Sequence, residues 1–370
     1  MIDIDIENFD YEGELQKIRE TITKPNILIT GATGAGKSSL VNRLFGTRTA
    51  AVGEGRPVTE GIRPYFSENL NVNLYDSEGY EVDSDENRRY RGTVLGFIDE
   101  RIEEGDMEQK IHEVWHCVSA AGKRVTDMDV DIINDIRERK IPVAIVFTQI
   151  DCVDAEELAA ITNRAEETCP GLAHFNVCCL DDEELQERLK DHLQFSELLD
   201  WASANLDESL REGFVSSLIG ALDRKRDIAE EKIVPMYTAL AAGVGAAPLP
   251  FADMFALIPL QVKMSMHIMN TYGINGFTGV GSRAVESFVV SQIGRIFART
   301  VTANIAKLIP VVGSLVGGAL NAAVAGAFTH KLGTTVSEMG YQYAYDTAVE
   351  GRNVPISEAF GSAALFENLL

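Results

Sequence analysis

The feature that most constrains the fold is a glycine-rich loop at residues 31–39, with the sequence Gly-Ala-Thr-Gly-Ala-Gly-Lys-Ser-Ser. It lies between the apolar run 27–29, a predicted strand, and the amphipathic stretch 40–45, a predicted helix. In this context, Gly-x4-Gly-Lys-Ser spacing is typical of a loop whose backbone N–H groups surround phosphate oxygens. Glycine allows the chain to turn tightly around an anion. We therefore predict a nucleoside triphosphate site formed by Gly31, Gly34, Ala35, Gly36, Lys37, Ser38 and Ser39.

The last residues of the loop have separate expected roles. Lys37 is expected to reach the β- and γ-phosphates, and the hydroxyl of Ser38 to ligate a Mg²⁺ ion. An ordinary glycine-rich turn is the alternative. The combination of strand, loop, Lys-Ser and amphipathic helix argues against it.

Composition limits the class of protein. The chain of 370 residues is longer than one typical domain, and its net charge of -23 argues against a nucleic-acid partner and against simple electrostatic adhesion to anionic lipid. Its five cysteines are odd in number and lack framework spacing, which favours a reducing cytosol. The acidic N-terminus has no apolar core of signal-peptide type. We expect a cytoplasmic protein.

The order of apolar and amphipathic segments predicts three regions. Residues 1–24 form a helical arm, expected to pack on the domain that follows. Residues 25–204 alternate strands with helices, which predicts a doubly wound, mostly parallel α/β sheet that binds ligands at the carboxyl ends of its strands. Residues 205–370 form an all-helical domain. Within the α/β region we expect strands at 70–75, 113–118, 142–147 and 173–178, and helices at 126–139 and 183–204.

Motifs at the predicted strand ends, taken in order with the loop, resemble those of the G domain of P-loop GTPases over about residues 25–200. Asp76-Ser77-Glu78-Gly79 corresponds to the third G motif and Thr148-Gln149-Ile150-Asp151 to the fourth. Thr59 stands where a switch-I threonine would lie. The resemblance is to the Era-like, translation-factor-related group.

This resemblance implies GTP or GDP with Mg²⁺ as ligands, and it assigns roles to single residues. Thr59 would close on the metal and the γ-phosphate, Asp76 would hold the metal through water, and the N–H of Gly79 would touch the γ-phosphate. The base would contact Thr148, Gln149, Asp151 and the backbone at Cys178, with Asp151 accepting from the guanine N1 and N2 donors.

Two residues depart from the family pattern. Gln149 stands where a lysine usually lies over the base, and Tyr80 follows Gly79 where Ras-like enzymes have the glutamine that orients water. Like this chain with Tyr80, Era-like and dynamin-like GTPases have a hydrophobic residue after the glycine of the third motif. The alternatives for positioning the water are Glu78, Arg56, a backbone carbonyl and a dimer partner, and Arg48 and Arg56 are the candidate arginines near the γ-phosphate.

A competing pattern is His112-Glu113-Val114-Trp115-His116, which matches the zinc-protease motif. On a helix both imidazoles would face one metal. The order of elements in a G domain requires a strand here. On a strand the side chains of the two histidines would not point toward a common metal. We therefore expect strand histidines without a metal.

The C-terminal half predicts helices. A long amphipathic helix is expected at 206–233, with Arg224, Lys225 and Arg226 on a solvated face, and another at 282–306. The uncharged segment 308–329 is long enough to span a bilayer but rich in Ala and Gly. Its alternatives are a buried helix of a soluble bundle and membrane contact. About residues 205–335 resemble a poorly characterised helical domain that follows G domains in some bacterial Era-like GTPases, with some membrane-associated relatives.

These observations predict a Mg²⁺-dependent GTPase switch that transmits its nucleotide state to the helical domain. The alternative is a nucleotide-gated tether or scaffold without useful hydrolysis. The expected partners are the guanine nucleotide, a membrane surface or protein effector, and a second copy in a nucleotide-dependent homodimer.

Overall fold

The computed structural model describes residues 10–46, 61–65, 70–80, 84–106, 108–245, 257–274, 317–352 and 354–355. These residues form two compact units. One unit runs from Ile22 to Ile219. The other combines the described residues before Ile22 with those after Ile219.

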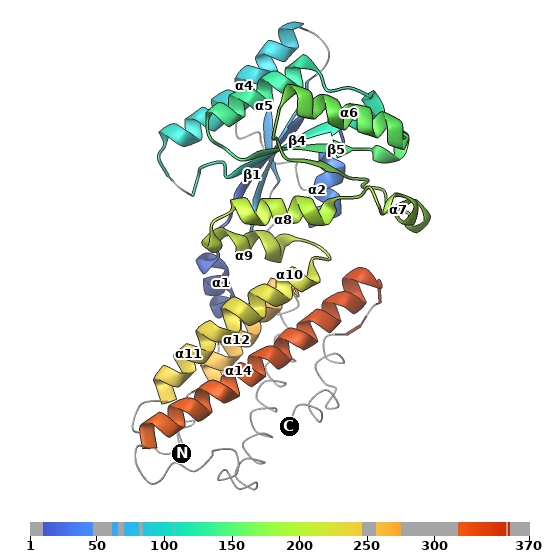
Figure 1. The fold of residues 1–370 in the computed structure, drawn as a ribbon. Helices are drawn as coiled ribbons and strands as arrows, with labels where there is room; N and C mark the ends of the chain where they lie inside the picture. Colours follow the sequence, from blue (N-terminus) through green and yellow to red (C-terminus); the bar gives the residue numbers. More distant parts are fainter. Residues whose placement is uncertain are drawn as a thin grey trace. The chain divides into compact units, whose positions relative to one another are not determined.

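A six-stranded sheet forms the first unit, in the order β2-β3-β1-β4-β5-β6. Four of its neighbouring pairs are parallel, and β2 alone pairs antiparallel, with β3. The predicted mostly parallel α/β fold is therefore confirmed (Figure 1). The strands are β1 (Asn26–Gly31), β2 (Ile62–Tyr65), β3 (Asn73–Ser77), β4 (Glu113–Ser119), β5 (Val143–Thr148) and β6 (His174–Asn176).

Helices cover both faces of this sheet (Figure 1). One face packs against α4 (Ser84–Glu103), α5 (Asp127–Glu138) and α6 (Ala155–Thr168). On the other face, Trp115 of β4 lies against Phe45 of α2 (Lys37–Phe45) and Phe214 of α9 (Glu208–Ser217). Capping boxes at Thr126 and Asp154 define where α5 and α6 begin.

The helix predicted at 183–204 is two helices, α7 (Glu183–Leu189) and α8 (Phe195–Asn205). The backbone N–H of Gln194 between them donates to the carbonyl of Asn176, at the end of β6. That contact anchors the interruption to the edge of the sheet.

The single helix predicted at 206–233 is also wrong. Helix α9 ends at Ser217, and the chain turns through Gly220, whose φ is 69°. A second helix, α10 (Leu222–Asp227), then continues through a π-helical turn at Ile228–Ile233 into α11 (Val234–Gly245). Lys225 is buried at 4% exposure, which corrects the expected solvated face.

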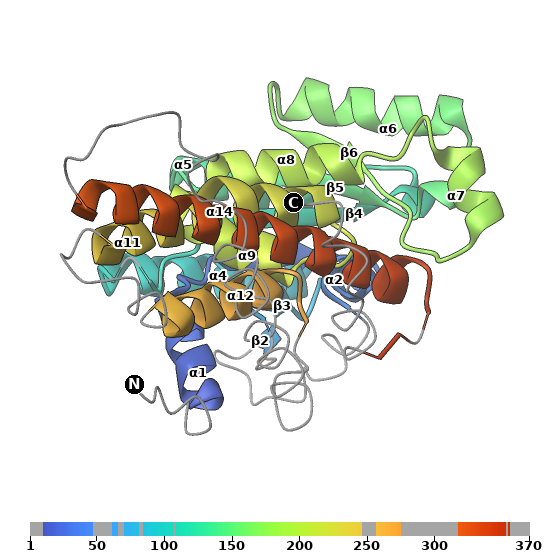
Figure 2. The same cartoon turned by 90° about the horizontal axis from the view of Figure 1, so that it is seen from below.

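The second unit is helical, and its long helix α14 (Gly317–Ala344) runs beside α11 and α12 (Ile258–Thr271) in both views (Figures 1 and 2). Small residues allow this approach. A Cβ on Gly333 would lie 2.7 Å from Val234, and one on Gly340 would lie 2.6 Å from Tyr272. The predicted helix at 282–306 and the first part of 308–329 lie outside the described residues. Among the residues described, no helix combines the length and apolarity needed to cross a membrane.

The N-terminal helix α1 (Tyr11–Thr21) belongs to the helical unit, although we expected the arm to pack on the domain that follows it. Its Glu14 forms an ion pair with Lys263, and Arg19 donates to Asn270 at 3.3 Å. Both partners are on α12. Leu15 and Ile18 of α1 are buried, and α1 packs against α12, a helix distant in sequence.

Candidate functional site: the cleft around the glycine-rich loop

The glycine-rich loop leaves β1 at Gly31 and enters α2 at Lys37, as predicted. Gly31 has a φ of 134°, and a Cβ on it would lie 2.1 Å from the carbonyl oxygen of Cys117 on β4. Gly34 and Gly36 have φ values of 76° and 77°. These conformations favour glycine, and they bring the loop into α2, whose first residues, 37–39, line the cleft described below.

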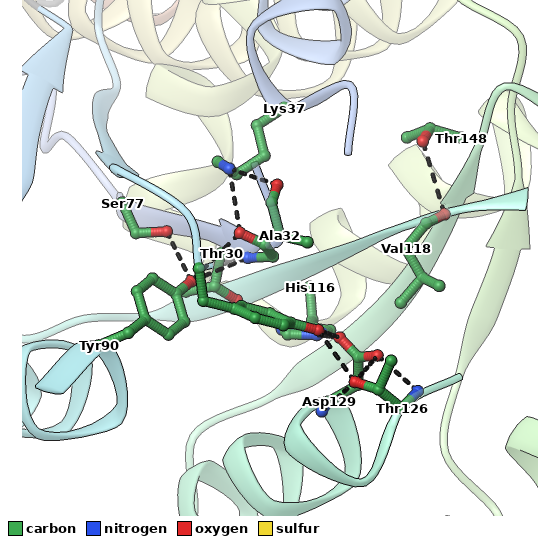
Figure 3. Close-up of polar contacts among 12 residues, drawn as sticks. Thr30, Ala32, Lys37, Ser77, Tyr90, His116, Val118, Thr126, Asp129 and Thr148 are labelled. Carbon is green, nitrogen blue, oxygen red and sulfur yellow. Dashed lines mark hydrogen bonds and ion pairs between the residues drawn. The ribbon is translucent and has the colours of Figure 1, made fainter. Parts of the chain in front are cut away.

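Lys37 is held inside the loop that precedes it. Its Nζ donates to the carbonyl oxygens of Gly31 and Ala32, each at 3.0 Å (Figure 3). Burial lowers the pKa of Lys37, and the nearby carboxylate of Asp76 opposes that shift. The buried ammonium group is a localised positive charge for an anion bound at the loop.

A cleft of about 640 Å³ opens beside the loop. It brings together residues from the loop, from β3 and from the fourth motif, which lie far apart in the sequence. Thr59, Arg48 and Arg56 lie outside the described residues. The lining consists of residues 33–39, Arg63, Asp76, Ser77, Glu78 and Gln149.

The side chains that line the cleft include the hydroxyl of Ser38 and the carboxylate of Asp76, oxygen groups of the kind that Mg²⁺ prefers. The Oδ1 atom of Asp76 is buried and has no hydrogen-bond partner among the described residues. Burial raises the pKa of Asp76, while hydrogen bonding from Tyr65 and the charge of Lys37 oppose the shift. An incompletely satisfied buried carboxylate beside a hydroxyl fits a hard divalent cation.

Gly79 packs directly on the loop. Its φ is 84°, and a Cβ there would lie 2.7 Å from the backbone nitrogen of Thr33 and 2.9 Å from Nζ of Lys37. The next residue, Tyr80, accepts a backbone hydrogen bond from Thr33 at 3.0 Å. The segment after β3 thus lies against the glycine-rich loop, because Gly79 has no Cβ and because Thr33 donates one backbone hydrogen bond to Tyr80.

The side chain of Tyr80 is buried and engages a polar network below the loop. Its hydroxyl donates to Asp129 on α5, which also contacts Nε2 of His116 at 2.8 Å. The Nδ1 atom of His116 lies 2.8 Å from Oγ1 of Thr30 on β1 (Figure 3). His116 is on a strand, as predicted, and its two ring nitrogens face Thr30 and Asp129.

The fourth motif touches the loop through two side chains. Oγ1 of Thr148 donates to the carbonyl of Ala35 at 2.8 Å, and Nε2 of Gln149 donates to the carbonyl of Gly34 at 3.2 Å. The other end of the Gln149 amide accepts from the hydroxyl of Ser119. Gln149 therefore connects the loop to the end of β4.

Asp151 lies next to two thiols. The Sγ atom of Cys178 donates to its Oδ1 at 3.3 Å, and that of Cys152 donates to its Oδ2 at 3.4 Å. Asp151 and Cys178, predicted to share the base site, are thus neighbours. Asp151 also lines a hollow of about 390 Å³ with Arg188 and His192.

Two residues of β2 were absent from the sequence prediction: Arg63, which lines the cleft, and Tyr65, which contacts two residues that line it. Arg63 pairs with Glu78 at 3.1 Å, and the hydroxyl of Tyr65 lies between Asp76 and Ser38. Strand β2 has four residues and contains Pro64, so the periodicity that would have identified it is too short to recognise.

The fold and the site together define a P-loop GTPase G domain. Residues 26–149 match the model of the family described as 50S ribosome-binding GTPase. Over 158 residues the chain is 30% identical to a probable GTP-binding protein EngB of Wolbachia sp. subsp. Brugia malayi, covering 42% of this chain and 76% of that protein. The chain belongs to this family of GTP-binding proteins.

Two further similarities are weaker. The chain is 26% identical over 108 residues to magnetosome membrane protein 22 of Magnetospirillum gryphiswaldense, which is 29% of this chain and about half of the relative, 55%. A solved structure of a probable GTP-binding protein engB matches at 18% identity with a TM-score of 0.34, covering 48% of this chain and 99% of that one.

Proposed function

We propose that the protein binds GTP with Mg²⁺ and hydrolyses it to GDP and phosphate, as a molecular switch of the Era-like group. The observation that carries the proposal is the cleft, where Lys37, Ser38 and Asp76 meet beside the glycine-rich loop. Gly79 closes on the same loop. A positive charge, two oxygen ligands and a row of backbone N–H groups are the parts that phosphoryl transfer requires.

Each residue has a proposed role. Backbone N–H groups of residues 34–39 bind the phosphates, Lys37 neutralises charge on the β- and γ-phosphates, and Gly79 donates its N–H to the γ-phosphate. Ser38 and Asp76 hold Mg²⁺, which supplies charge neutralisation when bound, and Thr59 completes this set in the GTP state. Asp151 reads guanine, with Thr148, Gln149 and Cys178 beside it.

The nucleophile is water, and the cleft offers Glu78 as the described residue that can orient it. The hydroxyl of Tyr80 is committed to Asp129. We therefore propose that the chain does not use the residue after Gly79 for water activation. A slow intrinsic rate, raised by a protein partner or a second copy, follows from this proposal.

A phosphate-release assay with Lys37→Ala tests the proposal. We expect the parent to release phosphate from GTP. The rate of the variant should be lower by a factor of about 100 or more, because the transition-state charge is no longer neutralised. Lys123→Ala is the matched control, since Lys123 is an exposed lysine paired with Glu157. Equal rates in parent and Lys37→Ala would contradict hydrolysis at this cleft.

A second candidate is a nucleotide-gated tether, favoured by the similarity to a protein named as a magnetosome membrane protein. Met236 and Leu240, one helical turn apart on α11, are exposed apolar side chains of the helical unit. In this proposal the helical unit meets a membrane or a protein effector from the cytoplasmic side when GTP is bound. Liposome flotation with GDP and with a non-hydrolysable GTP analogue tests it, and unchanged partitioning between the two nucleotides would exclude gating.

A further inference from the structure

Tyr65 ends β2, and its side chain is buried at 6% exposure above the start of α2. Its hydroxyl donates to Oδ2 of Asp76 at 2.7 Å and lies 3.2 Å from Oγ of Ser38. A tyrosine hydroxyl has one proton to give. Because Asp76 takes that proton, Ser38 is the donor in the second contact, and one phenolic oxygen occupies both groups.

Ser38 and Asp76 are also the two described residues assigned above to Mg²⁺. Mg²⁺ requires oxygen ligands at about 2.0–2.1 Å in near-ideal octahedral geometry. A serine hydroxyl that ligates a cation must turn a lone pair toward it and its proton elsewhere. The phenolic oxygen is neutral, and in its observed place it competes for the atoms that the cation needs.

We propose that Tyr65 is a gate on magnesium loading: its hydroxyl, which links Ser38 to Asp76, must leave both groups for Mg²⁺ to bind. This inference rests on the proposed function. It adds that Mg²⁺ affinity is set partly by a residue that is not a ligand, so Tyr65 acts through Ser38 and Asp76.

The position of Tyr65 in the sheet favours a gate over a fixed support. Strand β2 is at the edge of the sheet and has four residues, and β3 is the one strand it pairs with among the described residues. Its Ile62 is buried in the core that α4 covers, whereas Tyr65 is the last residue of the strand. Its register places Tyr65 opposite Leu74 and Arg63 opposite Asp76. Moving the tyrosine therefore disturbs one short ladder and leaves the other five strands paired.

The decisive measurement is the release of mant-GDP from the full chain at a series of Mg²⁺ concentrations. Mg²⁺ bound with the nucleotide slows release, so the half-maximal concentration reports Mg²⁺ affinity. In Tyr65→Phe the competing hydroxyl is absent, and we expect that concentration to fall roughly tenfold. Tyr272→Phe, which removes a buried hydroxyl bonded to Ser337 in the helical unit, is the matched control and should leave it unchanged.

Four results would contradict the gate or its basis, and they are distinguishable. An unchanged Mg²⁺ requirement in Tyr65→Phe shows that the hydroxyl does not compete, and a higher requirement shows that it supports the bound cation. Tyr65→Leu, which removes ring and hydroxyl together, must move the requirement in the same direction as Tyr65→Phe. A parent that binds no mant-GDP at any Mg²⁺ concentration overturns the proposed function, and the gate with it.

Discussion

The hydroxyl of Tyr80 donates a 2.5 Å hydrogen bond to the carboxylate of Asp129, a residue of α5 that is 3% exposed. The same carboxylate accepts from the backbone N–H and the hydroxyl of Thr126. His116 lies beside it from β4. One buried carboxylate thus joins the segment after β3, the start of α5 and the central strand.

Replacing this carboxylate is expected to destabilise the sheet unit. Asp129→Asn keeps the shape but presents an amide N–H₂ to donors, and we expect a loss of about 2–3 kcal/mol in the free energy of unfolding. Urea denaturation measures it. Asp131→Asn, an exposed position on the same helix paired with Arg91, is the control and should change stability by less than about 0.5 kcal/mol. A loss in Asp129→Asn as small as that in Asp131→Asn would show that the network does not contribute to stability.

Stability should also fall in acid through this residue. Burial alone raises the pKa of Asp129, but hydrogen bonding and charge from His116, with hydrogen bonds from Tyr80 and Thr126, outweigh it and lower the pKa to about 2. An unfolded aspartate has a pKa of about 3.9, so the unfolded chain takes up the proton first and stability rises with pH. The contribution is complete above about pH 5 and is lost between about pH 4 and pH 2.

Measuring the free energy of unfolding at pH 6 and at pH 3 tests whether stability rises with pH. The stability difference between the parent and Asp129→Asn should shrink as pH falls across that range. A difference that stays constant would show that Asp129 has an ordinary pKa in the folded protein.

Glu113 should change the stability of the fold with pH in the opposite direction to Asp129. It is fully buried on β4, and burial raises its pKa to about 8, with a hydrogen bond from Trp115 at 3.1 Å opposing the shift. Because the folded pKa lies above the unfolded value, the stability that Glu113 contributes is present in acid and is lost as pH rises toward 8. Glu113→Gln keeps an acceptor for Trp115 without the ionisation.

We expect Glu113→Gln to gain roughly 3 kcal/mol over the parent between pH 5 and pH 8.5, measured by denaturant unfolding at both pH values. Glu156→Gln, at an exposed position on α6, should show no pH-dependent gain. The idea fails if the two variants behave alike.

Gln149 should replace the family's lysine in function. Its amide reaches Gly34 and Ser119, so Gln149→Ala removes both contacts and should weaken GDP binding about fivefold to tenfold. Gln149→Lys keeps a donor for Gly34 and should stay within about threefold of the parent. Isothermal titration calorimetry with GDP compares the three proteins. Tighter binding of Gln149→Ala than of the parent would contradict this role.

The sequence predicted the parts of this molecule that local patterns define. The glycine-rich loop, the buried run that became β5 and the capped helix α5 follow from spacing and hydrophobicity over a few residues. The prediction of one helix at 206–233 failed because the amphipathic pattern continues across Gly220, where the chain turns.

Other features depend on contacts between distant segments, which a local pattern does not contain. Lys225 stands in a charged run that looks solvated, yet the helical unit buries it. Tyr65 belongs to a strand too short to detect, and it meets Asp76 and Ser38 only once β2 pairs with β3. The cleft was therefore predictable as a set of motifs, whereas the residue between its two proposed metal ligands was not.

The place of α1 has a consequence for how the chain is made. The helical unit is discontinuous, since α1 belongs to it together with residues from Gly220 onward, and the sheet unit is inserted between them. The contact of Arg19 with Asn270 joins residues 251 positions apart. On the ribosome α1 emerges before the sheet unit and α12 after it, so α1 can pack on α12 only once the sheet unit has been synthesised. A fragment beginning at Gly220 would lack its own first helix and expose the side of α12 that carries Lys263 and Asn270.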